Sequence, residues 1–361
     1  MLRSTLLLCG WLILALALQG EQRSVPTPNE AEFVLRHFRF NSGEELPELR
    51  MHYYTFGRPD RDAAGRVTNA VLILHGTGGS AQTFFRPIFA GVLFGAGQLL
   101  DSSRYFIIVP DNLGHGKSSK PSDGLHAHFP QYDYDDMIRA QHDLLEHGLG
   151  VNHLRLILGT SMGCMHSWVW GETYPDFMDA LMPLACNPVQ IAGRNRIWRK
   201  MIIDGIRQDP EWENGEYKTE PRSGLQIASY ALLIAGSAPQ VMQKGLLTRD
   251  AADQYLDDYT KREMSDLDAN DLLYALSASR NYDPSLKLDK ITAQVMFINS
   301  ADDFINPPEL GIAEREIKRV KHGRFILLPI SEKTHGHGTH TDAAIWQQYL
   351  KELLDETERQ R

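Results

Sequence analysis

Residues 154–175 read LRLILGTSMGCMHSWVWGETYP, and this stretch decides the fold. The apolar run up to Leu158 is typical of a strand that is buried on both faces of a parallel sheet. The residues from Met162 to Tyr174 are predicted to form a helix. Only the segment from Gly159 to Ser161 joins the two elements. A sharp strand-to-helix turn is therefore expected here, as in an α/β sheet.

The turn has the pattern Gly-x-Ser-x-Gly, with Ser161 between Gly159 and Gly163. In a strand–turn–helix context this pattern predicts a nucleophile elbow, which forces the serine backbone through a strained turn between small neighbours. The turn would lift Ser161 Oγ above the sheet edge and aim the backbone N–H of Met162 at a developing oxyanion, beside a helix N-terminus. The alternative is a serine that caps an ordinary helix.

A second oxyanion donor is expected in the loop after the third predicted strand, where VLIL is followed by HGTGGS at residues 75–80. The glycines allow the backbone to approach a reacting carbonyl closely. The N–H of Thr77 is the preferred donor and that of Gly76 the alternative. A phosphate-binding loop is disfavoured, since neither a Lys-Ser/Thr ending nor G-x-G-x-x-G is present. We predict no cofactor.

A serine nucleophile needs a base and an acid that orients it, and on this fold they follow in the order Ser, Asp, His. The strand QVMFIN at residues 294–299 is followed by Asp302 and Asp303. We prefer Asp303 as the acid and treat Asp302 as a turn or cap residue, although sequence alone does not separate them.

Three histidines follow the last predicted strand, FILLP at residues 325–329. His337 is the preferred base because Gly336 and Gly338 flank it in a tight loop; His340 is the next choice and His335 the last. The triplet His-x-His-x-x-His also resembles a zinc site. A metal explains only the histidines, whereas a serine triad explains the elbow, the glycine loop and the acid as well. We predict no metal.

The rest of the chain repeats short apolar runs separated by helical stretches, which favours an α/β fold with a sheet of eight mostly parallel strands flanked by helices. The two earliest strands are expected to form a hairpin, and the last helix has one apolar stripe. The predicted strands are Val34–Phe40, Leu49–Phe56, Ala70–His75, Tyr105–Pro110, His153–Gly159, Ala180–Cys186, Ala293–Asn299 and Arg324–Ile330, and the predicted flanking helices are Tyr134–His147, Met162–Tyr174 and Asp342–Glu358.

The alternation breaks for about a hundred residues after the sixth strand, where no strand pattern is found. We expect a helical cap at residues 187–286, inserted into a core of residues 21–186 and 287–361. Helices are predicted at Arg194–Gln208, Ser223–Gln243, Ala251–Glu263 and Asp268–Ser279. The basic cluster Arg194, Arg196, Arg199 and Lys200 is interpreted as a solvated helix face, and a phosphate-binding role is an alternative that nothing else in the sequence supports.

The first twenty residues are predicted to be a secretory signal peptide. Arg3 precedes the uncharged run Leu6–Leu18, which is too short for an ordinary membrane span, and small residues follow. An uncleaved anchor is the alternative. The protein is therefore expected to be secreted or periplasmic, with no membrane contact in its mature form. Removal of the leader leaves two cysteines, Cys164 and Cys186. A disulfide between them is compatible with an oxidising compartment, but two buried free thiols are the preferred interpretation.

Composition narrows the function classes. Of the 361 residues, 42% are hydrophobic and 23% charged, so a folded core is expected rather than disorder. The net charge of −9 argues against a general nucleic-acid binder, which needs a basic face.

The chain resembles the α/β-hydrolase superfamily, and within it the homoserine O-acetyltransferase-like branch. The resemblance rests on VPDNLGHGKSSKPSDG at 109–124, DMIRAQHDLLEHGLGVNHLRLILG at 136–159 and GTSMGCMHSWVWGETYPDFMDALMPLAC at 159–186. It implies Ser161 as nucleophile, Asp303 as acid, His337 as base, a helical cap over the site and often a homodimer.

The chain also departs from that branch. The acetyltransferases usually carry Gly where this chain has Cys164 and Gln where it has His166, and their histidine is followed by Asp rather than by Gly338. They are cytosolic and use acetyl-CoA, which an exported protein would lack. We therefore predict a serine hydrolase that cleaves an ester, lactone or thioester of a small-molecule acyl substrate. An O-acyltransferase is the first alternative and a non-catalytic binding protein the lower one.

Overall fold

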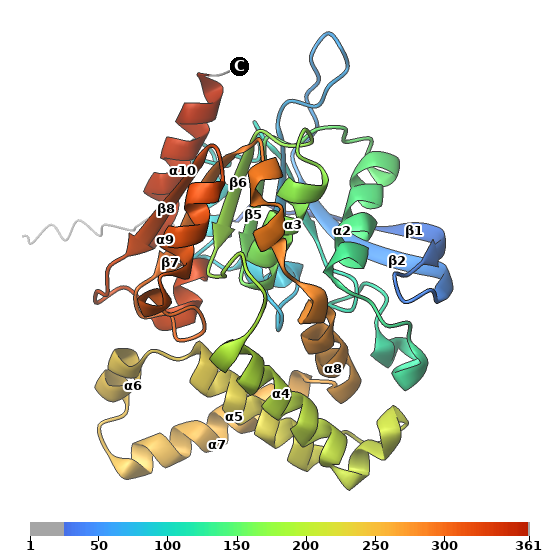
Figure 1. The fold of residues 1–361 in the computed structure, drawn as a ribbon, viewed down its shortest axis with the longest axis vertical. Helices are drawn as coiled ribbons and strands as arrows, with labels where there is room; N and C mark the ends of the chain where they lie inside the picture. The colour runs from blue at the N-terminus through green and yellow to red at the C-terminus, as the bar shows by residue number, and fades with distance from the viewer. Residues whose placement is uncertain (1–24, 360–361) are drawn as a thin grey trace, which may run out of the picture.

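The computed structural model describes residues 25–359, so the predicted leader at residues 1–20 lies outside the described residues. The chain forms an eight-stranded sheet in the order β1-β2-β4-β3-β5-β6-β7-β8 (Figure 1). β2 is antiparallel to both of its neighbours, and every other pair is parallel. The strands are β1 (Asn29–Arg39), β2 (Glu45–Phe56), β3 (Ala70–Leu74), β4 (Phe106–Pro110), β5 (Leu156–Thr160), β6 (Ala180–Leu184), β7 (Gln294–Ser300) and β8 (Gly323–Leu328). The prediction of eight mostly parallel strands is confirmed.

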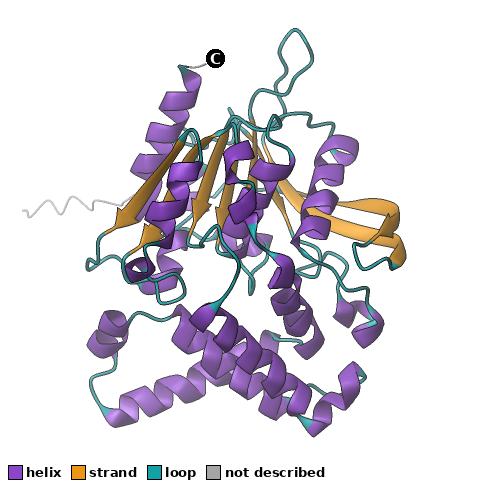
Figure 2. Ribbon diagram, in the orientation of Figure 1, coloured by secondary structure: helices purple, strands orange, loops and turns teal. Residues whose placement is uncertain are grey.

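Helices cover both faces of the sheet (Figure 2). One face packs against α2 (Tyr134–Asp143), α3 (Met162–Thr173) and α9 (Ile312–Glu316), and the other against α1 (Ala90–Leu93) and α10 (Ala343–Glu358). Each face has its own apolar cluster. Every residue of β3, β4, β5 and β6 is buried, which is why these strands read as continuous apolar runs.

Five helices between β6 and β7 form a separate layer beyond the carboxyl ends of the parallel strands (Figure 1). They are α4 (Gly193–Gln208), α5 (Arg222–Gly236), α6 (Pro239–Gly245), α7 (Arg249–Asp266) and α8 (Ala269–Ser277). Ile202 and Ile206 of α4 pack with Leu225 of α5 and Leu276 of α8 in a third apolar cluster. This layer therefore has its own core and faces the edge of the sheet that carries Ser161.

The single helix predicted at residues 223–243 is wrong. α5 ends at Gly236, Ser237 and Ala238 are extended, and Pro239 starts α6. A proline in a helix interior loses a backbone hydrogen bond and clashes with the preceding turn, so the chain bends here by 104°. Within residues 25–359, no single helix is long and apolar enough to cross a membrane; α5 and α6 reach that length and apolarity only when they are counted together.

The expectation of free thiols at Cys164 and Cys186 is also wrong, since the two form a disulfide. Cys164 lies in the first turn of α3 and Cys186 just beyond β6. The Ser161 N–H donates to Leu184 O at 2.9 Å, so the elbow holds the start of α3 against the end of β6. Two cysteines that are 22 residues apart in sequence are thereby brought to a Cα separation of 5.8 Å.

Candidate active site

Ser161 occupies a strained turn between β5 and α3. Its backbone has φ 53° and ψ −109°, in the left-handed half of conformational space that a residue with a side chain rarely adopts. Two backbone hydrogen bonds hold the turn: Ser161 N–H donates to Leu184 O, and Gly163 N–H donates to His75 O, both at 2.9 Å. The turn is thus anchored to both neighbouring strand ends.

The two glycines of the elbow have no room for a side chain. A Cβ on Gly159 would lie 1.9 Å from Gly163 O, and a Cβ on Gly163 would lie 2.0 Å from Leu74 O. Both obstacles are backbone atoms, which cannot rotate away. The glycine loop approaches the same serine, because a Cβ on Gly76 would lie 3.2 Å from the Ser161 Cβ.

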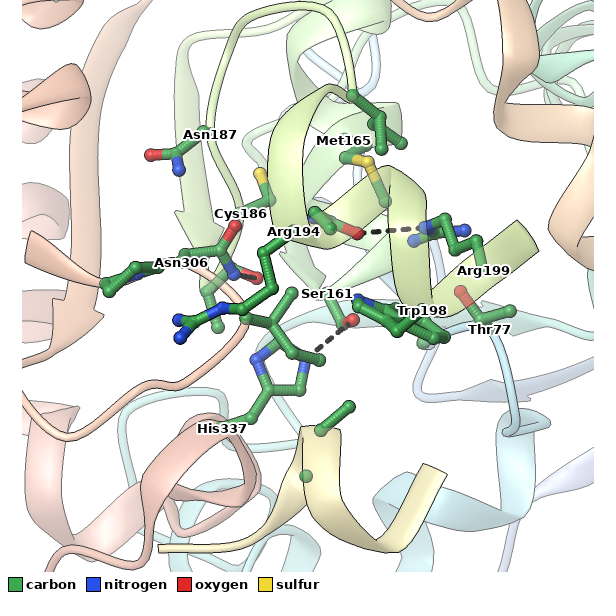
Figure 3. Close-up of a pocket in the computed structure, with 18 of the residues that line it drawn as sticks. Thr77, Ser161, Met165, Cys186, Asn187, Arg194, Trp198, Arg199, Asn306 and His337 are labelled. Carbon is green, nitrogen blue, oxygen red and sulfur yellow. Dashed lines mark hydrogen bonds between the residues drawn. The ribbon is translucent and has the colours of Figure 1, made fainter. Parts of the chain in front are cut away.

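His337 bridges Ser161 and Asp303 (Figure 3 shows Ser161 and His337 facing each other). His337 Nε2 lies 2.8 Å from Ser161 Oγ, and its Nδ1 lies 3.0 and 3.1 Å from the two Asp303 oxygens. With the Nδ1–H donating to the carboxylate, Nε2 is free to accept the Ser161 hydroxyl proton. The structure therefore brings together the three residues that the sequence analysis preferred.

Asp303 is buried and held in one orientation. It accepts the backbone N–H groups of Ile305 and Asn306 and the Asn306 side-chain amide at 2.8 to 3.2 Å. Burial alone would raise the pKa of the Asp303 carboxyl, but the adjacent His337 and the Asn306 hydrogen bonds outweigh it, so the pKa lies below its ordinary value. A fixed anion at this position orients the imidazole.

Asp302, the alternative acid, contacts the loop and not the imidazole. It accepts the Gly336 N–H at 2.9 Å and a hydrogen bond from Ser300. Gly336 has φ +70°, and a Cβ there would lie 3.1 Å from Ser237 O. Asp302 therefore shapes the turn that carries His337.

The other two histidines of the triplet point elsewhere. His335 Nδ1 lies 3.0 Å from Lys333 O, while the His340 ring packs edge-on against His337 with 5.0 Å between centroids. Burial and the neighbouring His337 lower the pKa of His340 to about 3, so His340 is neutral near pH 7. Among residues 25–359, no three His, Cys, Asp or Glu side chains are placed to bind a metal ion.

The two predicted oxyanion donors are not engaged in other hydrogen bonds within residues 25–359. In the described part of the chain, the backbone N–H groups of Thr77 and Met162 have no hydrogen-bond acceptor. Two buried histidines brace the glycine loop: His115 Nε2 lies 2.9 Å from Thr77 O, and His75 Nδ1 lies 2.8 Å from Gly76 O. Burial lowers the pKa of both imidazoles, which keeps them neutral. The sequence analysis did not predict that His75 and His115 support the glycine loop. The position of His75 directly before that loop could have suggested it.

A cavity of about 750 Å³ lies between the sheet edge and the cap helices, with Ser161 and His337 in its wall. Most of its lining is apolar, including Met165, Trp198 and Leu232. Leu310 in the same lining is 55% exposed, so the cavity opens to solvent. An ester that entered it would meet the Ser161 hydroxyl, the His337 imidazole and the free N–H groups of Thr77 and Met162 together.

Arg199 also lines this cavity, contrary to the prediction of a solvated basic face. It is only 2% exposed, although Arg194 and Lys200 on the same helix are exposed. Charge patterning did not separate the buried arginine from its solvated neighbours, because that difference depends on how α4 packs.

Comparison with known proteins identifies the family. The profile of the α/β hydrolase fold matches residues 69–326. The chain belongs to the α/β hydrolase fold family. It is 30% identical over 279 residues to a probable acyltransferase from Methanothermobacter thermautotrophicus (77% of this chain, 84% of that protein). It is 30% identical over 277 residues to a homoserine O-acetyltransferase from Haemophilus influenzae (69% and 75%).

A solved structure has the same fold. An acetylester hydrolase from Corynebacterium glutamicum superimposes with a TM-score of 0.78 at 21% identity, covering 91% of this chain and 96% of that one. The predicted fold and the resemblance to homoserine O-acetyltransferases are confirmed. This α/β hydrolase is therefore an enzyme whose relatives and structural neighbours are acyltransferases and esterases.

Proposed function

We propose that this α/β hydrolase is an exported serine hydrolase that cleaves an ester, lactone or thioester of a small to medium-sized substrate. The observation that carries the proposal is the continuous hydrogen-bond chain from Ser161 Oγ through His337 to the buried Asp303 carboxylate, in the wall of a cavity that opens to solvent. Residues 187–286 are proposed as the cap that covers this site.

In the proposed mechanism, His337 Nε2 takes the Ser161 proton as Oγ attacks the substrate carbonyl carbon. The N–H groups of Thr77 and Met162 stabilise the oxyanion, at the N-terminus of α3. His337 then gives its proton to the leaving group, which departs and leaves an acyl group on Ser161. Water attacks the acyl-enzyme with His337 as base. The acid product is released, and the Ser161 Oγ–H is restored.

Two observations support water as the acceptor. The cavity wall includes the exposed residues Arg194 and Leu310, so solvent reaches it. The Cys164–Cys186 disulfide supports an oxidising compartment, in agreement with the proposed leader, and cytosolic acetyl-CoA would be absent there.

Acyl transfer to a hydroxyl is the second candidate, because relatives that are 30% identical are acyltransferases. An acceptor alcohol would then take the place of water at the acyl-enzyme.

The test compares the wild-type protein with Ser161→Ala, using p-nitrophenyl acetate in one arm and acetyl-CoA with or without homoserine in the other. We expect ester turnover that ignores homoserine, no CoA release, and a loss of about 10⁴-fold or more in the variant. CoA release that requires homoserine would establish the transferase instead, and full activity in Ser161→Ala would refute the mechanism. The N-terminal residue of the exported protein tests the leader: a start near residue 21 is expected, and retention of residues 1–20 contradicts cleavage.

A further inference from the structure

Arg199 of α4 is a buried cation whose side-chain hydrogen-bond partners Asn195 and Ser279 are neutral. Its Nε donates to Asn195 Oδ1 at 3.0 Å and its Nη1 to Ser279 Oγ at 3.2 Å, while its Cζ lies 4.9 Å from the Trp198 ring centre. No ion pair joins Arg199 to any carboxylate within residues 25–359. Figure 3 shows Arg199 beside Trp198 in the wall of the cavity that contains Ser161.

A buried charge without a counter-ion is costly, because solvation by water is lost and no opposite charge replaces it. Burial lowers the pKa of the Arg199 guanidinium, but arginine remains protonated in proteins. Asn195 and Ser279 satisfy some of its donors and none of its charge. The Arg199 guanidinium is therefore a buried positive charge in the cavity wall that an anionic ligand could neutralise.

Three further arginines lie in or beside the cavity, in a chain whose net charge is −9. Arg194 lines the cavity, and its Nη2 donates to the Phe304 carbonyl. Arg196 and Arg280 line an adjoining surface depression that shares the wall 190–193 with the cavity. None of these three is in an ion pair with a carboxylate of the described chain. Glu309, which is exposed, is the acidic residue among the described lining residues.

We infer that the substrate of this enzyme carries a carboxylate, which Arg199 binds while Ser161 attacks the ester. The inference rests on the proposed hydrolase function and adds the substrate class. A carboxylate is favoured over a phosphate because one buried guanidinium neutralises one negative charge, and the other two charged residues of the lining, Arg194 and Glu309, are exposed and of opposite sign. Arg194, Arg196 and Arg280 raise the local concentration of an anionic substrate at the opening.

The test uses matched pairs of esters that differ only in a terminal carboxylate. On the acyl side the pair is p-nitrophenyl valerate and the mono-p-nitrophenyl ester of glutarate; on the alcohol side it is butyl acetate and 4-acetoxybutanoate. We expect the wild-type protein to prefer the anionic member of at least one pair by about tenfold or more in kcat/KM. In Arg199→Gln this ratio should fall by about tenfold or more, to near one, because truncating a buried charge partner removes most of its differential binding.

Lys200→Gln is the matched control. It removes the same charge one residue away, but Lys200 is exposed and pairs with Asp204 at 2.7 Å, so the ratio should stay within about twofold of wild type. Arg199→Lys keeps a charge without the guanidinium fork and should give an intermediate ratio. Thermal unfolding of each variant checks the fold. If Arg199→Gln does not fold, the ester ratio of Arg199→Lys tests the inference in its place.

Three outcomes overturn the inference: no preference for either anionic ester while the neutral esters are cleaved, a preference that survives in Arg199→Gln, or a stronger preference for phosphorylated esters of the same length. If the wild-type protein cleaves none of these esters, the proposed hydrolase fails and not this inference. Calorimetric titration of Ser161→Ala with 4-acetoxybutanoate then decides: binding that Arg199→Gln abolishes supports it, and equal or absent binding overturns it.

Discussion

Two regions face each other across the cavity, the sheet edge and the cap. At the sheet edge, Ser161, Asp303 and His337 each lie in the segment that follows a strand, so a local pattern places each of them. In the cap, α4 and α5 supply wall residues such as Arg199 and Leu232 that no local pattern distinguishes from their neighbours. The difference teaches that the proposed chemistry is encoded in strand–turn units, whereas substrate selection depends on how separate helices pack.

The largest expected effect tests whether the sheet edge works through the predicted acid. Asp303→Asn should lower kcat by about 10⁴-fold, because an amide favours the wrong imidazole tautomer and gives no charge to its protonated form. Asp302→Asn should cost about tenfold or less, since Asp302 holds the Gly336 N–H and not the imidazole. Both are measured with p-nitrophenyl acetate, and equal losses would contradict the division of roles between the two aspartates.

The next effect compares glycines of the two regions. Gly163→Ala should destabilise the fold by about 3 kcal/mol or more, because its new Cβ would meet Leu74 O at 2.0 Å and a backbone atom cannot move aside cheaply. Gly245→Ala, at the end of α6, meets nothing within 4 Å and should change stability by about 1 kcal/mol or less. Urea unfolding measures both, and a similar loss in the two variants would show that the elbow tolerates a side chain.

The smallest effect is a pH dependence that buried histidines give to the core. His75, His115, His166 and His340 are buried with lowered pKa values, whereas residues 187–286 contain no histidine. Below about pH 6.5 these four histidines bind protons in the unfolded chain but not in the folded chain, so their contribution to stability is full above that pH and falls on acidification. For His340 the fall continues to its folded-state value of about 3.

We expect His340→Gln to make this fall shallower by about 1 kcal/mol per pH unit between pH 6 and 4.5. Asp303 does not obscure the effect, since its pKa is lowered from 3.8 and its contribution is lost only below that range. Urea midpoints at several pH values measure the slope, and an unchanged slope in His340→Gln would show that this ring is charged when folded.

Much of the core could be predicted, since the buried strands β3 to β7 follow from apolar runs and the helix α10 from its stripe around Trp346 and Leu350. The errors have physical causes. Pro239 lies inside a periodic apolar stretch, and periodicity outweighed the proline signal in the prediction of one helix. The disulfide needed the elbow to place α3 against the end of β6, which the spacing of Cys164 and Cys186 does not reveal.

By itself, the sequence determined the order of strands and helices, the elbow at Ser161 and the residues preferred as its partners, because periodicity and turn chemistry act over a few residues. The tertiary structure placed Asp303, and not Asp302, against His337, paired the cysteines and buried Arg199 in the cavity wall. These outcomes depend on distances between segments that are far apart in the chain, and such distances exist only after the sheet and the cap have packed together.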